Sequence, residues 1–388
     1  WEYYYNDAGR QMRLLGESVY TRYREILGEE AELPENGYEG EYIRDIAQEI
    51  FSDHNDSLKD DGENLIFKEK AEETIFAHIR KTLGNVGIEM DSYVNEKTFY
   101  DDGSIDSVVA DLREQGLAYD ADGAVWFKTT KLGKDQDTVL IKSSGEPTYR
   151  LPDIAYHCQK VKRGFDLIVD IFGTDHQATY PDVLAGVEKL GNKIDHIRVL
   201  IHQFVTLKSA GEKVKMSTRK AEYVTLQELI ESVGVDVVRY FFIMRGMQSH
   251  LNFDLELATK ESEENPVYYL QYAHARICNI IKFGKEAGVI SDHKLDLSLL
   301  VELSELRLIK EIIRFPEVAQ SALEILEPQI IANYLQEVAT SFHKFYTECR
   351  VITDDAELTT ARLALVSATR VVLANGLTIL GISRPERM

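Results

Sequence analysis

Two polar segments follow apolar runs, at the positions where a binding site would form. The first run, residues 167–172, predicts a strand that is buried on both faces, and Gly173-Thr-Asp-His-Gln177 follows it directly. The second run, residues 197–201, is followed by residues 202–206, and a helical pattern over 181–190 separates the two runs. This order predicts a strand–helix–strand unit with parallel strands. Because ligands bind beyond the carboxyl ends of parallel strands, both polar segments are candidate binding residues.

A loop rich in cations follows this unit. Residues 209–213 read Ser-Ala-Gly-Glu-Lys, and residues 215–220 read Lys-Met-Ser-Thr-Arg-Lys. Lysine and arginine on such a loop suit a polyphosphate, because they neutralise the charge that builds up on a leaving pyrophosphate. Charge clustering alone, however, favours a plain solvent-exposed basic loop.

The composition is that of a globular protein, and it limits the function. Of the 388 residues, 44% are apolar, and no uninterrupted apolar run reaches the roughly 20 residues that span a bilayer. The 44 basic and 65 acidic residues give a net charge of −21, which argues against a protein that holds nucleic acid by bulk electrostatics. Cys158, Cys278 and Cys349 form no Cys-x-x-Cys pair, which indicates a reducing compartment and no structural zinc. Glycine-rich dinucleotide, P-loop and His-Glu-x-x-His motifs are absent from the sequence.

Hydrophobic periodicity divides the chain into a mixed part and a helical part. It predicts helices within residues 1–52 and near 65–83, and short strands at 124–127 and 138–141. From Thr225, which can form a capping box with Glu228, the pattern is almost wholly helical to the last residue. We therefore expect four parts, with boundaries at 1–62, 63–141 (a small α+β insertion), 142–255 and 256–388 (a helical bundle).

Several sequence boxes, taken together and in this order, resemble the arginyl-tRNA synthetase family. The segment Lys215-Met-Ser is similar to the Lys-Met-Ser-Lys-Ser loop of class I aminoacyl-tRNA synthetases, and the other boxes specify the member. These boxes are Tyr3-Tyr-Tyr-Asn-Asp-Ala-Gly9, Gly145–Ala155, Asp236-Val-Val-Arg-Tyr-Phe-Phe242, Tyr269-Leu-Gln-Tyr-Ala-His-Ala-Arg276 and Pro385-Glu-Arg-Met388. The resemblance implies an α/β fold: an incomplete Rossmann-like class I nucleotide fold with an α+β insertion, followed by an all-α anticodon-binding bundle.

The resemblance also implies an arginine site. In the family, a Tyr and an Asp four residues later hold the substrate guanidinium, and the matching residues here are Tyr149 and Asp153. A carboxylate and a hydroxyl suit a planar cation, and His176 is the implied side-chain contact beside them. The alternative is that Asp153, just after Pro152, is only a first-turn acid stabilised by the helix dipole.

Further roles are implied for ATP and for the chemical step. The implied ATP-binding residues are Gly173, Asp175, His202, Phe204, Val205 and Met216. The implied catalytic residues are Lys215, Ser217, Arg219 and Lys220. Because Thr218 stands where the class has its second lysine, the residue that replaces this lysine stays open.

The helical part is similar to the anticodon-binding domain of the family. The residues that match positions near the anticodon loop are Tyr272, Ala273, Tyr346, Arg350 and Met388. Unpaired bases stack on aromatic rings and guanidinium planes, which suits these residue types. The alternative is that Tyr268, Tyr269 and Tyr272 form an aromatic stripe that faces the helical core.

The implied activity is that of an arginine–tRNA ligase. Such an enzyme activates L-arginine with ATP and Mg²⁺, binds no zinc or other resident metal, and transfers the amino acid to the 3′ end of tRNA(Arg). We expect it to act in the cytoplasm as a monomer that does not bind a membrane. The ten histidines include no His-x-Gly-His, the class I motif that holds the triphosphate. We therefore expect a chain that lacks the N-terminal part with this motif and is inactive by itself. The alternative is a non-catalytic anticodon-binding module.

Overall fold

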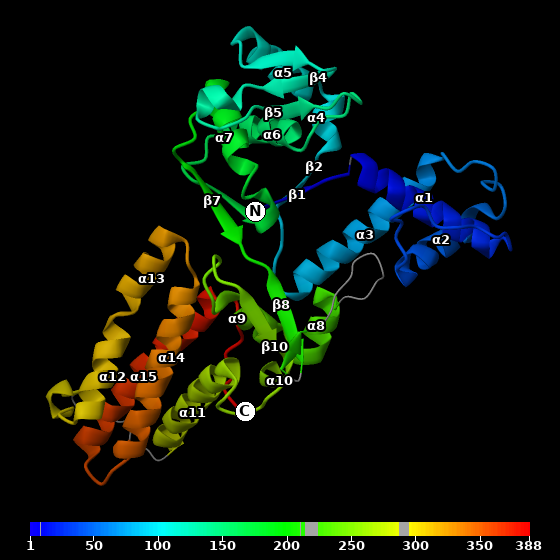
Figure 1. The fold of residues 1–388 in the computed structure, drawn as a ribbon. Helices are drawn as coiled ribbons and strands as arrows, with labels where there is room; N and C mark the ends of the chain where they lie inside the picture. The colour runs from blue at the N-terminus through cyan, green and yellow to red at the C-terminus, as the bar shows by residue number, and fades with distance from the viewer. Residues whose placement is uncertain (8, 210, 214–223, 287–294) are drawn as a thin grey trace. The chain divides into compact units, whose positions relative to one another are not determined.

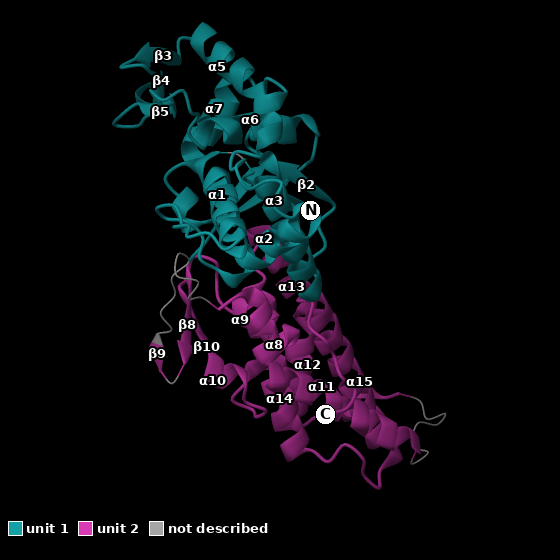
Figure 2. Cartoon of the chain, turned by 90° about the vertical axis from the view of Figure 1, so that its right-hand side faces the viewer, with its two compact units in different colours: residues 1–203, 215–223 teal, residues 204–214, 224–388 magenta. Residues whose placement is uncertain are grey.

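The chain forms two compact units in the computed structural model, which describes residues 1–388 except 8, 210, 214–223 and 287–294. Unit 1 comprises residues 1–203 together with 215–223, and unit 2 comprises residues 204–214 together with 224–388 (Figures 1 and 2). Each unit has its own hydrophobic clusters, two in unit 1 and one in unit 2.

Unit 1 contains a cluster of three helices near its start. These helices are α1 (Gly9–Ile26), α2 (Glu41–His54) and α3 (Leu65–Asn85). The predicted helical face of α2 is confirmed, because Ile43, Ile46, Ala47 and Ile50 are all buried against α1 and α3. Helix α3 buries Phe67 and Ala71 in the same cluster. Helix α3 therefore packs with α1 and α2, although the predicted division of the chain placed it in the insertion at 63–141.

Two short strands join segments of unit 1 that lie far apart in the chain. Strand β1 (Glu2–Tyr5) pairs in parallel with β2 (Ser92–Asn95), with Tyr4 opposite Val94. The sequence did not predict β1. The pairing matters for function because it places Glu96, the residue after β2, beside Tyr4.

The small insertion is an antiparallel sheet covered by helices. Strands β3 (Ala118–Ala121), β4 (Ala124–Phe127) and β5 (Thr138–Ile141) are paired in this order, next to α4 (Lys97–Asp101), α5 (Ser104–Glu114) and the 3₁₀ turn η1 (Thr129–Leu132). Both strands predicted here are confirmed. Asp122 and Gly123 turn the chain between β3 and β4 with φ of 50° and 73°, the left-handed conformations that a tight hairpin requires.

The predicted strand–helix–strand unit is confirmed in unit 1. It consists of β6 (Ile168–Gly173), the 3₁₀ turn η2 (Thr174–His176), α7 (Tyr180–Lys189) and β7 (Ile197–His202), and it follows α6 (Arg150–Lys162). Strands β6 and β7 are parallel neighbours, with Gly173 opposite His202.

The expectation that β6 is buried on both faces is wrong. Ile168 and Asp170 are buried, but 38% of Val169 and 65% of Ile171 is exposed. The cause is the period of two along a strand: Asp170 faces α6, where it contacts His157, and the odd-numbered residues point to the other face. In the described ranges of the chain, β7 is the only strand paired with β6.

Unit 2 begins with a small sheet. Strand β8 (Val205–Ser209) pairs in parallel with β10 (Leu251–Asp254) and antiparallel with β9 (Glu212–Lys213). Three helices lie near this sheet in the sequence: α8 (Leu226–Val233) and α9 (Val235–Ile243) precede β10, and α10 (Leu255–Ala258) follows it. The predicted capping box at the start of α8 is confirmed, because the Thr225 side chain accepts from the Glu228 amide and the Glu228 side chain accepts from the Thr225 amide.

The remainder of unit 2 is the predicted helical bundle. Its elements are α11 (Pro266–Glu286), the 3₁₀ turn η3 (Leu297–Leu299), α12 (Leu303–Ile313), α13 (Phe315–Ile325), α14 (Gln329–Glu348) and α15 (Ala356–Ile379). One hydrophobic cluster runs from Leu207 and Phe253 of the sheet through Phe241 of α9 into the bundle. Helix α15 is long and apolar enough to cross a membrane by composition alone, but half of its apolar stretch is buried inside the bundle, as in the core helix of a folded domain.

Candidate functional sites

The predicted arginine residues lie at the start of α6. Asp153 is in the first turn of this helix, and Tyr149 precedes its first residue. Tyr149 is 60% exposed and lines a cavity of about 620 Å³ together with Glu96, Tyr100 and Arg150. Asp153 is not among the residues that line this cavity, and it shares with Tyr149 only the start of α6.

Glu96 is a second carboxylate at this site, and the sequence analysis missed it. Its side chain is buried and accepts hydrogen bonds from the hydroxyls of Tyr4 at 3.3 Å and Tyr100 at 3.2 Å. Burial raises the pKa of Glu96, and the two tyrosine hydroxyls partly oppose this rise. No local pattern marks the residue, because only the β1–β2 pairing of segments 90 residues apart places it here.

The two carboxylates make the pKa of Asp153 unusual. Burial, together with the charges of Glu96 and Asp170, raises this pKa to about 7, and the charge of Lys160 opposes the rise. A cation between Asp153 and Glu96 would relieve both the lost solvation and the mutual repulsion. A guanidinium, with five N–H donors in one plane, suits such a pair of acceptors.

A second group of predicted residues meets at the carboxyl ends of β6 and β7. Gly173 and His202 are neighbours across the two strands, and Asp175 and His176 follow in η2. His176 stacks on Phe172 at 4.8 Å between ring centroids, and its Nε2 lies 3.9 Å from Asp175 Oδ2. A side chain on Gly173 would start 2.7 Å from Asp175 Oδ1. These residues thus form the polar edge expected for a ligand site of a parallel sheet.

The other predicted ATP and catalytic residues either belong to unit 2 or lie outside the described residues. Phe204 and Val205 belong to unit 2, where Val205 begins β8 and Phe204 is exposed. Five predicted residues lie outside the residues that the structure describes: Lys215, Met216, Ser217, Arg219 and Lys220.

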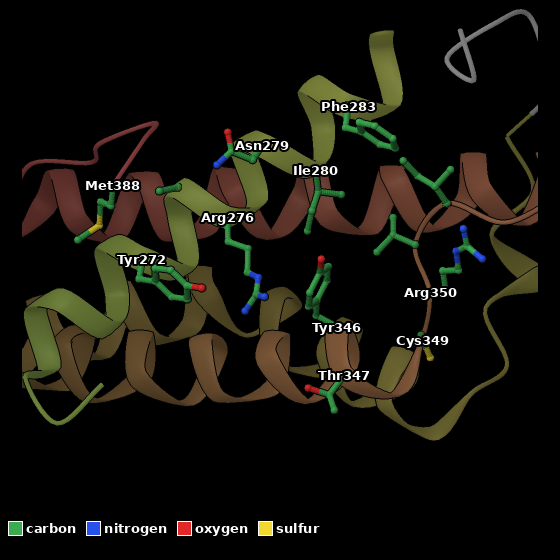
Figure 3. A pocket seen from close by; sticks show the side chains of 13 residues that line it. Tyr272, Arg276, Asn279, Ile280, Phe283, Tyr346, Thr347, Cys349, Arg350 and Met388 are labelled. Carbon is green, nitrogen blue, oxygen red and sulfur yellow. The ribbon is translucent and has the colours of Figure 1, made fainter. Parts of the chain in front are cut away.

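Four of the five predicted RNA-contacting residues line one pocket in unit 2. Tyr272, Tyr346, Arg350 and Met388 surround a cavity of about 760 Å³ (Figure 3). Arg276, which the sequence analysis did not single out, lies between the two tyrosines, with its guanidinium carbon 4.4 Å from the Tyr346 ring centroid and 5.4 Å from that of Tyr272. Its spacing of four residues from Tyr272 on a helix was the signal that could have identified it.

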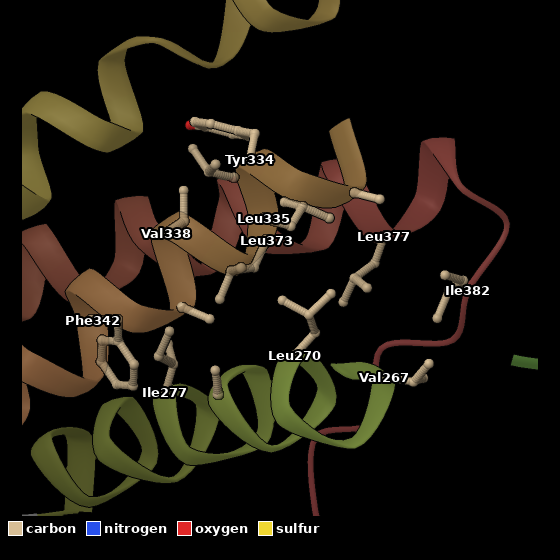
Figure 4. Packing of buried hydrophobic residues seen from close by; sticks show 14 of the residues in the cluster. Val267, Leu270, Ile277, Tyr334, Leu335, Val338, Phe342, Leu373, Leu377 and Ile382 are labelled. Carbon is tan, nitrogen blue, oxygen red and sulfur yellow. The ribbon is translucent and has the colours of Figure 1, made fainter. Parts of the chain in front are cut away.

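Ala273 does not join this pocket. It is fully buried and belongs to the hydrophobic cluster of the bundle. The reason is helical geometry: Ala273 lies on the same face of α11 as Leu270 and Ile277, whose side chains point toward α14 and α15 (Figure 4). A direct contact of its side chain with RNA is therefore excluded in this fold. Tyr272, one residue earlier, points to the pocket.

The C-terminal tail is fastened beside the pocket by residues of two other sequence boxes. Asp236 accepts a hydrogen bond from the Ser383 amide at 2.9 Å, and the Gln271 side chain donates to the Ser383 carbonyl at 3.1 Å. His274 Nδ1 lies 2.9 Å from the Pro385 carbonyl oxygen. These contacts join three boxes that are distant in the sequence, those that begin at Asp236, Tyr269 and Pro385. Together they hold Met388 at the pocket.

Comparison with known proteins identifies the family. Residues 7–238 match the class I tRNA synthetase (R) catalytic domain, and residues 270–388 match the DALR anticodon binding domain. The arginine–tRNA ligases of Salinibacter ruber and Desulfotalea psychrophila are 50% and 52% identical to this chain over its whole length. The chain belongs to the arginyl-tRNA synthetase family.

Solved structures agree with this family. A Campylobacter jejuni protein described as an arginyl-tRNA synthetase is 32% identical and superimposes over 100% of this chain and 84% of its own, with a TM-score of 0.88. The Thermus thermophilus arginyl-tRNA synthetase, at 20% identity, shares the fold with a TM-score of 0.72, over 100% of this chain and 75% of its own. The resemblance and the α/β-plus-helical fold class inferred from the sequence are thus confirmed.

Family membership gives the activity. The protein is an ATP-dependent ligase that joins arginine to tRNA, with a class I catalytic domain and a helical anticodon-binding domain. The chain covers 72% of the length of the Salinibacter ligase and 70% of that of the Desulfotalea ligase.

Proposed function

We propose that Asp153, Glu96 and Tyr149 recognise the guanidinium of L-arginine, and that ATP converts this arginine to arginyl-adenylate before its transfer to tRNA(Arg). The observation that carries the proposal is the raised pKa of both carboxyls: burial raises each, and the charge of Glu96 adds to the rise for Asp153. Asp153 supplies the anion, Glu96 the second anion with its orientation fixed by Tyr4 and Tyr100, and Tyr149 an exposed hydroxyl at the cavity.

Replacement of Asp153 tests this role. In Asp153→Ala, arginine affinity should fall at least about 100-fold, because one charge-assisted partner and the preorganised geometry are both lost, whereas ATP affinity should change less than about threefold. The measurement is equilibrium binding of each substrate, in the protein with any natural sequence upstream of Trp1 restored. Asp106→Ala is the matched control, since Asp106 is an exposed acid in the first turn of α5. Equal losses of arginine and ATP affinity in Asp153→Ala would refute the role.

We further propose that the strand-end residues hold ATP and that the cationic loop carries the chemical step. Gly173 lets the Asp175 carboxylate lie close to the backbone, since a Cβ there would start 2.7 Å from Asp175 Oδ1, while His176 and His202 border the proposed arginine and adenosine region. Phe204, Val205 and Met216 complete the proposed ATP set. Lys215, Ser217, Arg219 and Lys220 would neutralise the charge that develops on the leaving pyrophosphate. Rate enhancement then comes from positioning and from this neutralisation, and the enzyme forms no covalent intermediate.

Mg²⁺ is proposed to enter the site with ATP. Within the described part of the chain, no group of three or more His, Cys, Asp or Glu side chains is arranged to hold a metal ion. Mg²⁺ commonly binds through substrate phosphates and keeps several waters, so the ion would neutralise phosphate charge without a dedicated protein cage.

The pocket of unit 2 is proposed to take unpaired bases of the tRNA(Arg) anticodon loop. The stack of Tyr272, Arg276 and Tyr346 offers two aromatic rings and a guanidinium plane at one cavity, which is the surface that bases use in single-stranded recognition. Arg350 and Met388 line the same cavity. Arg350 could pair with a phosphate, and Met388 could pack on a base.

The remaining features of the enzyme are proposals that rest on its family. We propose that it acts as a monomer in the cytoplasm, where its tRNA and ATP are found. The four-part division at 1–62, 63–141, 142–255 and 256–388 is also a proposal. Its support is that the two matched domains leave residues 239–269 between them.

A further inference from the structure

The tail of unit 2, residues 383–388, has little apolar burial to hold it in place. Helix α15 ends at Ile379, and Ile382 is the last buried apolar side chain, a member with Val267 of the hydrophobic cluster of the bundle (Figure 4). Beyond it, Ser383 and residues 386–388 are exposed, with 54% of Met388 accessible. Chain ends of this kind fray unless they are tied down, because ordering them costs conformational entropy. Hydrophobic burial therefore does not explain the position of the tail.

Asp236 of α9 is the centre of the hydrogen bonds that hold the tail. Its Oδ1 accepts from the Ser383 amide at 2.9 Å. Its Oδ2 accepts from the Ser383 hydroxyl and, at 2.7 Å, from Gln271 Nε2. Gln271 also donates to the Ser383 carbonyl at 3.1 Å. One carboxylate thus accepts three hydrogen bonds, and bonds to a charged acceptor are the stronger ones.

The usual role of an acid in the first turn of a helix does not account for these bonds. Helix α9 begins at Val235 after Gly234, and no side-chain hydrogen bond caps its start. Asp236 instead uses its oxygens for the tail and for Gln271 of α11. The helix dipole favours an acid at this position, but it does not require the three donors that converge on the carboxylate.

Two further contacts fix the tail on either side of Ser383. Before it, Arg239 of α9 donates from Nε and Nη2 to the Leu380 carbonyl, at 3.2 and 3.1 Å. After it, His274 Nδ1 lies 2.9 Å from the Pro385 carbonyl oxygen, so this nitrogen carries the proton and donates. Anchors on α9 and α11 thus set the course of the tail up to three residues before its last one.

We propose that Asp236 is a positioning residue for tRNA(Arg) binding: it holds the tail so that Met388 forms one wall of the base pocket. Met388 lines this cavity together with Tyr272 and Tyr346, whereas Asp236 is not among the lining residues. Loss of the anchor releases the tail and takes the Met388 side chain away from a bound base. The inference rests on the proposed base-binding role of the pocket.

A double-mutant cycle separates this role from a general loss of structure. Asp236→Ala and Met388→Ala are made singly and together, in the protein with any natural sequence upstream of Trp1 restored. The affinity for tRNA(Arg) is measured by filter binding at fixed salt, with the melting temperature in parallel. Glu317→Ala is the matched control, because Glu317 is an exposed acid in the first turn of α13 and its removal causes the same loss of helix-dipole stabilisation.

Ser383→Ala tests the same anchor from the side of the tail. Ser383 is exposed, so its replacement leaves α9 intact while it removes the hydroxyl that donates to Asp236. The amide of residue 383 keeps its own bond to Asp236. Affinity for tRNA(Arg) should therefore fall less than in Asp236→Ala, by roughly two- to fivefold, and this loss should also vanish when Met388 is already alanine.

The expected result is a loss of tRNA affinity that depends on Met388. In Asp236→Ala affinity should fall roughly 3- to 20-fold, because a charged anchor is lost while those of Arg239 and His274 remain. In the Met388→Ala background the same change should cost less than about twofold, since the side chain that Asp236 positions is already absent. Glu317→Ala should stay within about twofold of the original affinity, and its melting temperature should match that of Asp236→Ala within about 2 °C.

The outcomes distinguish the inference from the proposed function. Unchanged affinity in Asp236→Ala, or the same fold-loss with and without the Met388 side chain, would overturn the inference. A loss in Tyr346→Ala without a loss in Asp236→Ala refutes the positioning role and leaves the base pocket standing. Full tRNA affinity in Tyr346→Ala means that the proposed base-binding role itself fails.

Discussion

At the scale of single residues, burial raises the pKa of both carboxyls at the proposed arginine site. The charge of Glu96 raises the pKa of Asp153 further, and the charge of Asp7 raises that of Glu96. The sequence could predict Asp153 and Tyr149, because their spacing is part of a family box. It could not predict Glu96, whose place depends on a parallel pairing between β1 and β2.

The pocket of unit 2 shows the same limit of sequence reasoning. The family box indicated Tyr272 and Ala273 alike, although neighbouring residues on a helix face different directions. Burial decides between them, since Ala273 packs in the core while Tyr272 lines the pocket. The alternative was that Tyr268, Tyr269 and Tyr272 all face the helical core. Of these three, Tyr269 packs against the hydrophobic cluster of the bundle.

Tyr346 provides a test of the base-stacking role. Tyr346→Ala removes the ring that lies 4.4 Å from the Arg276 guanidinium, and tRNA(Arg) affinity should fall roughly 5- to 160-fold, the equivalent of about 1–3 kcal/mol per stacked base. Tyr346→Phe, which keeps the ring, is the matched control and should stay within about twofold of the original affinity. Affinity is measured by filter binding at fixed salt. Unchanged binding in Tyr346→Ala would return this residue to a purely structural role.

At the scale of elements, helix order and strand order were predictable, but exposure was not. Alternation of apolar runs and helical patterns predicted β6, α7 and β7 in their correct places. The both-face burial of β6 was wrong, since an apolar run reports a preference for burial and does not report which elements cover the strand. Glu305 of α12 shows the opposite departure from residue type: it is a charged residue with no exposed surface. It is stabilised by Arg362 from α15, 57 residues away.

The Arg362–Glu305 pair connects the packing of α12 and α15 to Arg350, which lines the pocket of unit 2. Arg362 Nε donates to Glu305 Oε1 at 2.7 Å, and its Nη1 donates to the Arg350 carbonyl at 2.8 Å. Arg362→Met should destabilise the fold by roughly 3–5 kcal/mol, because it leaves a buried carboxylate unpaired. Chemical denaturation measures this. Lys260→Met, which breaks the exposed Lys260–Glu264 pair, should cost less than about 1 kcal/mol. Similar small losses in both variants would contradict the argument.

At the scale of the whole molecule, the net charge bears on how the protein binds tRNA, and the separate hydrophobic clusters bear on how it unfolds. A net charge of −21 supports the proposal that placed aromatic and basic groups, and not a general positive field of this chain, hold tRNA. The separate clusters of the two units mean that each unit buries its own apolar surface. Hydrophobic periodicity predicted a mixed part and a helical part, but the boundary after residue 203 follows the sheet of β8 and β10, whose parallel pairing the sequence did not indicate.

Calorimetry tests the independence of the two units. We expect at least two unfolding transitions, since cooperative unfolding follows contiguous clusters. Arginine at 100 times its dissociation constant should stabilise only the transition of unit 1, by about 2.7 kcal/mol, and Asp153→Ala should abolish this shift. A single transition that arginine shifts as a whole would contradict the separation.

The most direct test of the central claim compares arginine with citrulline. Citrulline has nearly the same shape but carries a neutral urea group, so it cannot neutralise Asp153 and Glu96. Binding of both is measured by calorimetry from pH 5.5 to 8.5, in the protein with any natural sequence upstream of Trp1 restored. Because the pKa of Asp153 is raised to about 7, this carboxyl is protonated below that pH and ionised above it. Arginine affinity should therefore rise with pH through about 7, and citrulline should bind at least about 100-fold more weakly at pH 8. Equal affinity for the two ligands, or arginine affinity that does not change across pH 7, would contradict the account.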